Sequence, residues 1–101
     1  MKKIPSNFQV GGQNIEVRFV DRCDYNNAGN SFLGAGYIKI AKMFNESDLQ
    51  SEGSQRNTFF HELTHAILDT MGEVDLSKNE KFVNCFAGFL TEAMTNAVFN
   101  E

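Results

Sequence analysis

The sequence predicts an α+β fold in which a small, mainly antiparallel sheet from the N-terminal half packs on two long helices. Short extended-type patterns separated by turn residues occur in residues 1–50, whereas long helical patterns occur in residues 51–101. A chain of 101 residues with 42% hydrophobic content is long enough for one hydrophobic core and too short for two. We therefore expect residues 1–101 to form a single domain.

The strands are predicted from alternation and from turn residues. Residues 15–20 alternate apolar and charged side chains, which is typical of a half-buried strand, and residues 36–41 form a second extended run. Gly11-Gly12 is a turn signal between extended segments. Residues 24–30 are rich in Asp, Asn and Gly, so their composition predicts a loop.

Two helices are predicted in the second half. The first covers residues from about 54 to 71 and ends before Gly72, a typical residue after a helix C-terminus. The second covers residues from about 78 to 98, where Ser77 and Glu80 have the spacing of a capping box. We expect its apolar face to pack in the core; that face comprises Phe82, Phe86, Phe89, Leu90, Ala93 and Ala97.

Composition excludes several classes of function. Thirteen acidic and nine basic residues give a net charge of −4, which argues against a nucleic-acid-binding protein. Apolar runs are too short to cross a membrane, and residues 1–7 lack the apolar segment of a secretory signal. We expect Cys23 and Cys85 to be reduced thiols in a cytoplasmic protein. Nothing in the sequence indicates an oligomeric state.

The first helix contains a metal-site pattern, His61-Glu62-Leu63-Thr64-His65, which has the form H-E-x-x-H. Residues i and i+4 lie about 40° apart around a helix, so both imidazoles project from one face and can bind one zinc ion. Glu62 lies on the adjoining side of the helix, where it can face a water on the metal. That position is suited to a general base in hydrolysis.

A protein zinc site needs a third ligand, and no histidine remains to supply it. The best candidate is Glu80 at the start of the second helix, although the same glutamate could instead complete the capping box. The other candidates are Asp69, Glu73, Asp75 and the two cysteines. Asp69, one turn beyond His65, can alternatively support a ligand from outside the metal shell or be a solvated surface residue.

The pattern His61-Glu62-x-x-His65 followed by Glu80-x-x-x-Asn84 resembles the gluzincin class of zinc metallopeptidases. Within that class it is most similar to the ImmA/IrrE-like group of bacterial and phage metallopeptidases, whose second helix carries E-x-x-A-N-x-F-A-x-x-L-L. The resemblance covers residues from about 54 to 94 and implies a minimal zincin-like core whose sheet holds the substrate backbone. It implies His61, His65 and Glu80 as ligands and Glu62 as base. Asn84 would orient a ligand histidine, or else be a packing amide.

The sequence thus predicts a metallopeptidase that binds one Zn²⁺ per chain and hydrolyses a peptide or protein substrate. We expect the strand at residues 37–41 to pair with an extended peptide. Tyr25 and Tyr37 are candidates for stabilising the oxyanion, but packing roles are an alternative for both. Two other classes of function fit the sequence: a non-catalytic zinc-stabilised protein-interaction domain, and a metal-free helical partner-binding domain.

Overall fold

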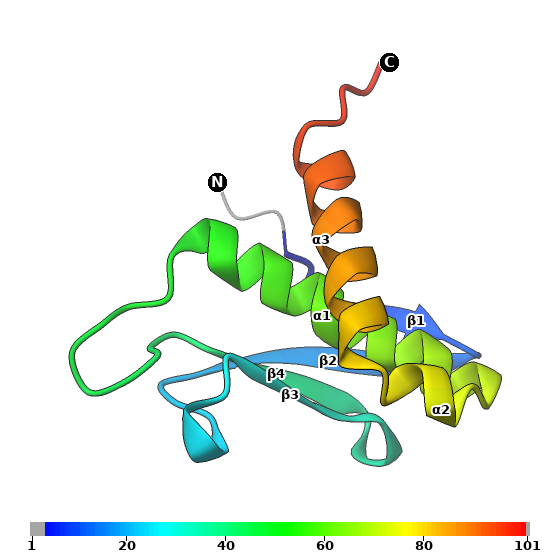
Figure 1. The fold of residues 1–101 in the computed structure, drawn as a ribbon, viewed down its shortest axis with the longest axis horizontal. Helices are drawn as coiled ribbons and strands as arrows, with labels where there is room; N and C mark the ends of the chain where they lie inside the picture. Colours follow the sequence, from blue (N-terminus) through cyan, green and yellow to red (C-terminus); the bar gives the residue numbers. More distant parts are fainter. Residues whose placement is uncertain (1–3, 101) are drawn as a thin grey trace.

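A computed structural model describes residues 4–100 and confirms the α+β fold (Figure 1). The elements follow the chain in the order β1 (Asn7–Val10), β2 (Gln13–Val20), β3 (Gly29–Phe32), β4 (Tyr37–Ala41), α1 (Glu52–Met71), α2 (Val74–Ser77) and α3 (Glu80–Thr95). Short 3₁₀ turns at Asp24–Asn26 and Leu33–Ala35 flank β3. The sheet therefore comes from the first half of the chain and the helices from the second.

The four strands form one mixed sheet in the order β1-β2-β4-β3. β1–β2 and β3–β4 are antiparallel, whereas the central pair β2–β4 is parallel. Gly11 and Gly12 connect β1 to β2 with φ angles of 59° and 80°, the left-handed values that a tight hairpin turn requires. The predicted strands at residues 15–20 and 36–41 correspond to β2 and β4.

The prediction of a loop over residues 24–30 was wrong at its C-terminal end. Only its first part is a turn, because β3 begins at Gly29 and pairs with β4 from Gly29↔Ile40 to Phe32↔Tyr37. The segment Gly29-Asn30-Ser31 has few residues that favour strands. It is extended because the partner strand binds it, so local composition did not reveal it.

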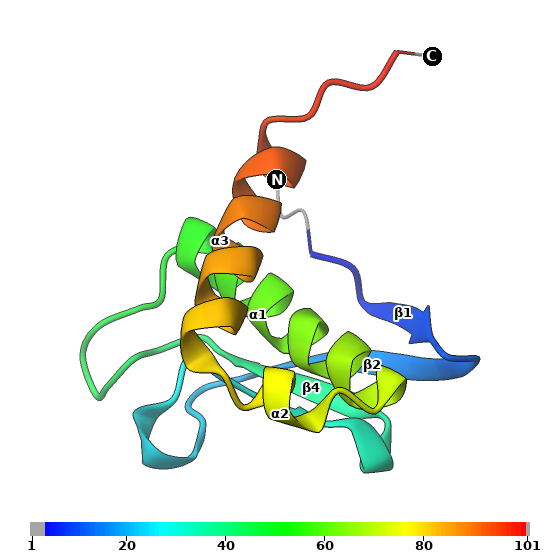
Figure 2. The same ribbon diagram turned by 45° about the vertical axis from the view of Figure 1, so that its right-hand side comes forward.

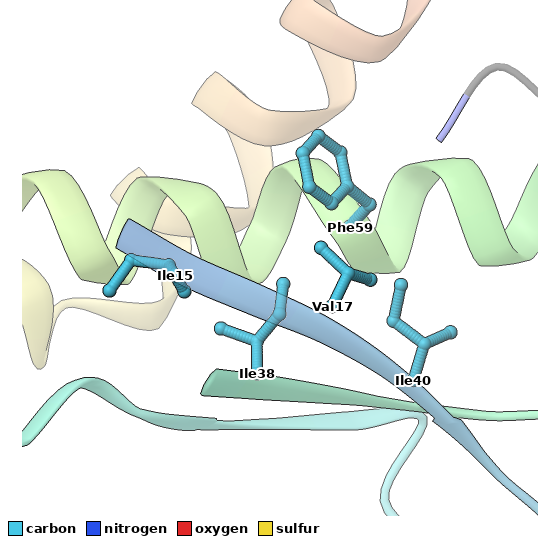
Figure 3. Close-up of a cluster of buried hydrophobic side chains, with 5 residues drawn as sticks. All are labelled: Ile15, Val17, Ile38, Ile40 and Phe59. Atoms are coloured by element: carbon cyan, nitrogen blue, oxygen red, sulfur yellow. The ribbon is translucent and has the colours of Figure 1, made fainter. Parts of the chain in front are cut away.

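The core lies between the sheet and α1 (Figure 3). Alternate residues of β2 and β4 point toward this helix, as the period-2 pattern requires. Phe59 meets them from α1, and Phe8 packs edge-to-face on its ring at a centroid distance of 5.6 Å. The buried cluster consists of Ile15, Val17, Ile38, Ile40 and Phe59.

Both long helices begin with a capping side chain. Ser51 accepts a hydrogen bond from the backbone N–H of Ser54 at the start of α1, and Gly72 ends that helix with φ 81°. At the start of α3, Asn79 accepts from the backbone N–H of Phe82. The second helix thus covers Glu80–Thr95 instead of residues 78–98, and Ser77 is not its cap because it lies in the separate turn α2.

The arrangement of the helices explains a second error of the sequence analysis. α1 lies across one face of the sheet, and α3 crosses α1 on the side away from the sheet (Figure 2). The buried residues of α3 are Val83 and Ala87, whereas Phe86 is 47% and Phe89 72% exposed. The predicted core face of α3 therefore lies largely in solvent, because residues 4–100 form no further layer that covers it.

The length and hydropathy of these helices bear on membrane insertion. Within residues 4–100, none is at once long enough and apolar enough to cross a bilayer.

Candidate metal centre

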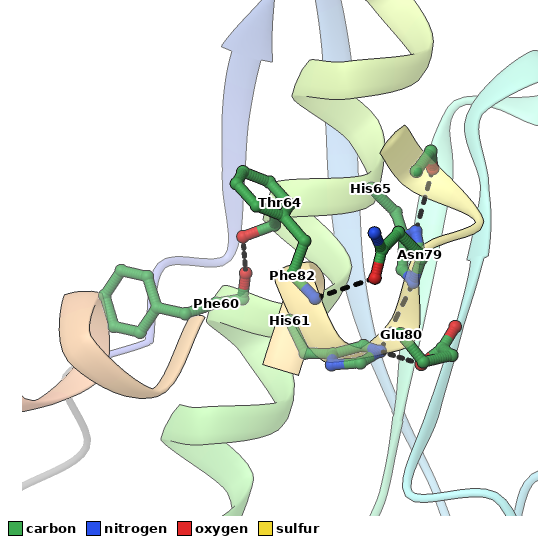
Figure 4. Close-up of polar contacts among 8 residues, drawn as sticks. Phe60, His61, Thr64, His65, Asn79, Glu80 and Phe82 are labelled. Carbon is green, nitrogen blue, oxygen red and sulfur yellow. Dashed lines mark hydrogen bonds and ion pairs between the residues drawn. The ribbon is translucent and has the colours of Figure 1, made fainter. Parts of the chain in front are cut away.

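Two histidines on one face of α1 begin the site. His61 and His65 are one turn apart, and their Nε2 atoms lie 3.3 Å from each other (Figure 4). Tetrahedral coordination with Zn–N bonds of about 2.0–2.1 Å places two ligand atoms about 3.3–3.4 Å apart. The separation of the two ring nitrogens therefore suits a shared zinc ion.

A carboxylate from α3 lies next to the two imidazoles. Glu80 is the first residue of that helix, and its Oε2 is 4.0 Å from Nε2 of His61. One ligand atom from each of His61, His65 and Glu80 lies within 4.8 Å of the others. The Glu80 side chain is 66% exposed, which leaves it room to approach a metal more closely.

The choice among third ligands follows from this geometry. Across residues 4–100, His61, His65 and Glu80 are the one group of three such side chains close enough to hold a metal ion. Glu73, Asp75 and the two free cysteines are not part of it. The alternative that Glu80 completes a capping box with Ser77 is not supported, because Asn79 caps α3 and Ser77 lies in α2.

A serine from α2 holds one of the imidazoles. The Nδ1 atom of His65 is 2.9 Å from the Ser77 hydroxyl. If Nδ1–H donates to this oxygen, Nε2 is left with the lone pair that a metal requires. Sequence reasoning missed this contact because it took Ser77 for a helix cap; the twelve-residue separation from His65 gives no local signal.

An amide from α3 holds the other imidazole. The side chain of Asn84 hydrogen-bonds the ring of His61. Burial and the nearby His65 lower the pKa of His61, while Glu80 and Asn84 act in the opposite direction. The net effect favours a neutral imidazole, which is the form that binds metal.

Glu62 is a buried carboxylate beside the two histidines. It is only 6% exposed, and burial together with the charge of Glu80 raises its pKa from 4.5 to about 7. The sequence analysis predicted a position next to the histidines, facing a water on the metal, and gave no indication that this side of the helix is covered. In the structure β3 covers this side of α1, and it also buries Thr58, which is 6% exposed.

A glycine makes this close approach of β3 to α1 possible. A Cβ added at Gly29 would lie 2.6 Å from the Thr58 methyl carbon, 2.8 Å from the Lys39 carbonyl oxygen and 3.3 Å from Cγ of Glu62. All three distances are shorter than ordinary van der Waals contact, and the first two are too short for the neighbouring atoms to stay in place. A larger residue at this position would therefore force β3 away from the buried carboxylate.

The site opens into a cavity of about 690 Å³ between β3, α1 and the start of α3. The ionisable residues in its lining are the two histidines and Glu62, Asp69 and Glu80. Asp69 is exposed on the cavity wall and stands outside the metal-ligand group. The remaining lining residues are small or polar: Asn27, Ala28, Gly29, Asn30, Ser31, Asn57, Thr58 and Asn84.

Neither tyrosine proposed for the oxyanion lies in this cavity. Tyr25 is 95% exposed. Tyr37 stacks on Phe32 at a centroid distance of 5.1 Å and lies under the Arg18 guanidinium, 3.8 Å from its ring centroid. In β4 the neighbouring Ile38 points toward α1, so Tyr37 is on the opposite face of the sheet and has a packing role.

Comparison with models of protein families, with curated proteins and with solved structures gave no match to this chain. The functional interpretation therefore rests on the residues and their geometry.

Proposed function

We propose that this protein is a zinc-dependent peptidase in which His61, His65 and Glu80 bind the metal and Glu62 is the general base. The observation that carries the proposal is the meeting of these three ligand atoms within 4.8 Å, in a cavity whose lining also includes the buried Glu62. Three protein ligands leave one coordination position open, which is the arrangement of catalytic rather than structural zinc sites. Zinc held there would supply Lewis-acid activation of the scissile carbonyl and of water.

Glu62 has the properties of the proton-transfer group. It is buried and lines the same cavity as the ligands. A bound cation would favour its ionised form, so in the zinc-bound protein Glu62 would be a carboxylate able to accept a proton. In the proposed reaction its carboxylate takes a proton from the attacking water and delivers it to the leaving amine. Ser77 and Asn84 keep the two imidazoles oriented during this transfer.

An extended peptide is the proposed substrate, and β3 is its docking edge. The expected pairing at residues 37–41 is wrong, because β4 lies between β2 and β3 and has no open edge. β3 is an edge strand, and residues Asn27–Ser31 line the cavity. The backbone N–H of Ala41 donates to the carbonyl of Ala28, so alternation points the backbone groups of Gly29 and Ser31 toward the open edge.

The resemblance to gluzincins, and to the ImmA/IrrE-like group in particular, is part of the same proposal. It is supported by the position of Glu80 one residue after the cap of α3 and by the hydrogen bond between Asn84 and His61. We also propose a cytoplasmic location, in keeping with the two cysteines, which are both free.

Metal analysis combined with a peptidase assay tests the proposal. We expect about one zinc per chain in the wild type and in Glu62→Gln, and hydrolysis of a quenched fluorescent peptide library only in the wild type. His61→Ala and Glu80→Ala should lose zinc, whereas Glu73→Ala, which changes an exposed glutamate outside the cluster, should retain it.

Three outcomes would contradict parts of this proposal. Full zinc affinity in Glu80→Ala would remove Glu80 as the third ligand. Equal hydrolysis by the wild type and Glu62→Gln would remove the general base. Stoichiometric zinc without hydrolysis, together with unfolding on chelation, would indicate the non-catalytic zinc-stabilised domain instead.

A further inference from the structure

An aromatic stripe on α3 points away from the metal centre. With about 100° per residue, Phe82, Phe86, Phe89 and Ala93 fall within about 60° of arc. Their spacing of four, three and four residues is that of the a and d positions of a coiled coil. We call these four residues the Phe stripe. In both views the C-terminal turns of α3 extend away from the sheet (Figures 1 and 2).

The contacts of α3 within the domain leave this stripe unpartnered. α3 packs on α1 through Val83 and Ala87, which are 0% and 1% exposed and lie about 90–130° around the helix from the stripe. By contrast Phe86 is 47% and Phe89 72% exposed, and Phe82 contacts Phe86 in a stacked pair with centroids 5.8 Å apart. Solvent-exposed aromatic rings in a row of this kind mark an interaction surface.

We infer that the Phe stripe is the interface of a homodimer, in which α3 packs antiparallel against α3 of a second copy. The stripe is self-complementary in this orientation. An axis between Phe86 and Phe89 places each of these rings against the other in the partner, and places Phe82 against the small Ala93.

Charge favours the second copy and fixes the orientation. Lys81 and Glu92 lie on the same flank of the stripe, near its two ends. Antiparallel packing brings Lys81 of one copy beside Glu92 of the other, twice over. In parallel packing the two copies would carry this flank on opposite sides of the interface, so neither Lys81–Glu92 pair would form. The ligand Glu80 lies on the opposite side of α3, so the dimer leaves the metal cavity open.

The size of the interface predicts its affinity. α3 has 16 residues and is about 24 Å long, so two stripes with their flanking side chains bury about 1,000 Å² in total. This is near the lower limit for specific interfaces, and we therefore expect a Kd in the micromolar range.

Sedimentation velocity of the complete protein from about 5 to about 500 μM brackets such a Kd and tests the inference. The wild type should change from the monomer to twice the chain mass. Phe89→Glu, which introduces a charge at the most exposed ring of the stripe, should remain monomeric. Met71→Glu is the matched control, because Met71 is 67% exposed but lies at the end of α1, and it should dimerise as the wild type does. Circular dichroism should show equal helix content in all three proteins.

A wild type that stays monomeric at the highest concentration would overturn the inference, as would equal dimerisation by Phe89→Glu. The orientation has its own test. Lys81→Glu and Glu92→Lys should each raise Kd several-fold, and the double variant should restore it. Single reversals without effect would exclude the antiparallel pairing. Dimerisation should persist in the presence of a chelator. The result of the sedimentation experiment is therefore independent of the zinc stoichiometry that tests the proposed peptidase.

Discussion

Replacing Glu62 by Gln should stabilise the metal-free protein, and the gain should grow with pH. The carboxyl is buried, and its pKa in the folded protein is about 7 instead of 4.5. An acid whose pKa is raised by folding contributes stability below its unfolded pKa, and this contribution is lost as pH rises through the folded value. The wild type therefore loses stability between about pH 4.5 and pH 7, while the Gln variant does not incur this loss.

The magnitude follows from the two pKa values. At about 1.36 kcal/mol per pH unit, the wild type is destabilised by about 3 kcal/mol at pH 8 but by only about 1 kcal/mol at pH 5. The lowered pKa of His61 acts in the opposite sense, because its contribution is lost as pH falls through the folded value. That loss occurs in both proteins, so the difference between them isolates Glu62.

Urea unfolding in excess chelator, at one protein concentration and at pH 5 and pH 8, measures this difference. Glu46→Gln is the control, since it removes an exposed loop carboxylate and should bring no gain. A gain that is the same at both pH values, or absent at pH 8, would refute the argument. With zinc added the gain should shrink, because a cation beside Glu62 favours its ionised form.

Three further perturbations address the surroundings of the site and the core. Ser77→Ala should weaken zinc binding about 10- to 100-fold, because it removes the hydrogen-bond partner of His65. Competition with a chromophoric chelator measures this affinity, and an unchanged affinity would show that the contact does not contribute to zinc binding. Gly29→Ala should lower the melting temperature, and it should lower the rate of hydrolysis even when the protein holds its full zinc content. Gly34→Ala is the control and should leave both quantities unchanged, because an added Cβ at Gly34 meets no atom within 4 Å. Ile40→Ala should cost about 2–5 kcal/mol in urea unfolding, because this core side chain is fully buried.

Local patterns in the sequence were sufficient for much of the fold and for the spacing of the site. Alternation predicted β2, an extended run predicted β4, and helical periodicity predicted α1 up to its Gly72 terminus. The H-E-x-x-H spacing placed His61 and His65 on one face because only helix geometry is involved. Glu80 was predicted because no third histidine remains, and Asn84 was predicted from the resemblance to gluzincins.

What the sequence did not reveal depends on contacts between distant elements. β3 becomes a strand through pairing with β4, and its Gly29 approaches α1 in a way that local composition does not indicate. The contact between Ser77 and His65 needs the short turn α2, which no periodicity predicts. The apolar face of α3 was recognised, but a periodic pattern identifies an apolar face without saying what covers it.

The position of α1 between two layers links the buried carboxylate to the partly exposed histidines that are proposed to bind metal. Phe59 must face the sheet, and His61 and His65 must face the start of α3. At about 100° per residue, the position after His61 then falls between these directions, under the edge of β3. Glu62 is therefore buried by the same packing that leaves the histidines accessible. The free-energy cost of this arrangement falls on the metal-free protein, and a bound cation would relieve it, so metal binding and folding stability should be coupled through this one side chain.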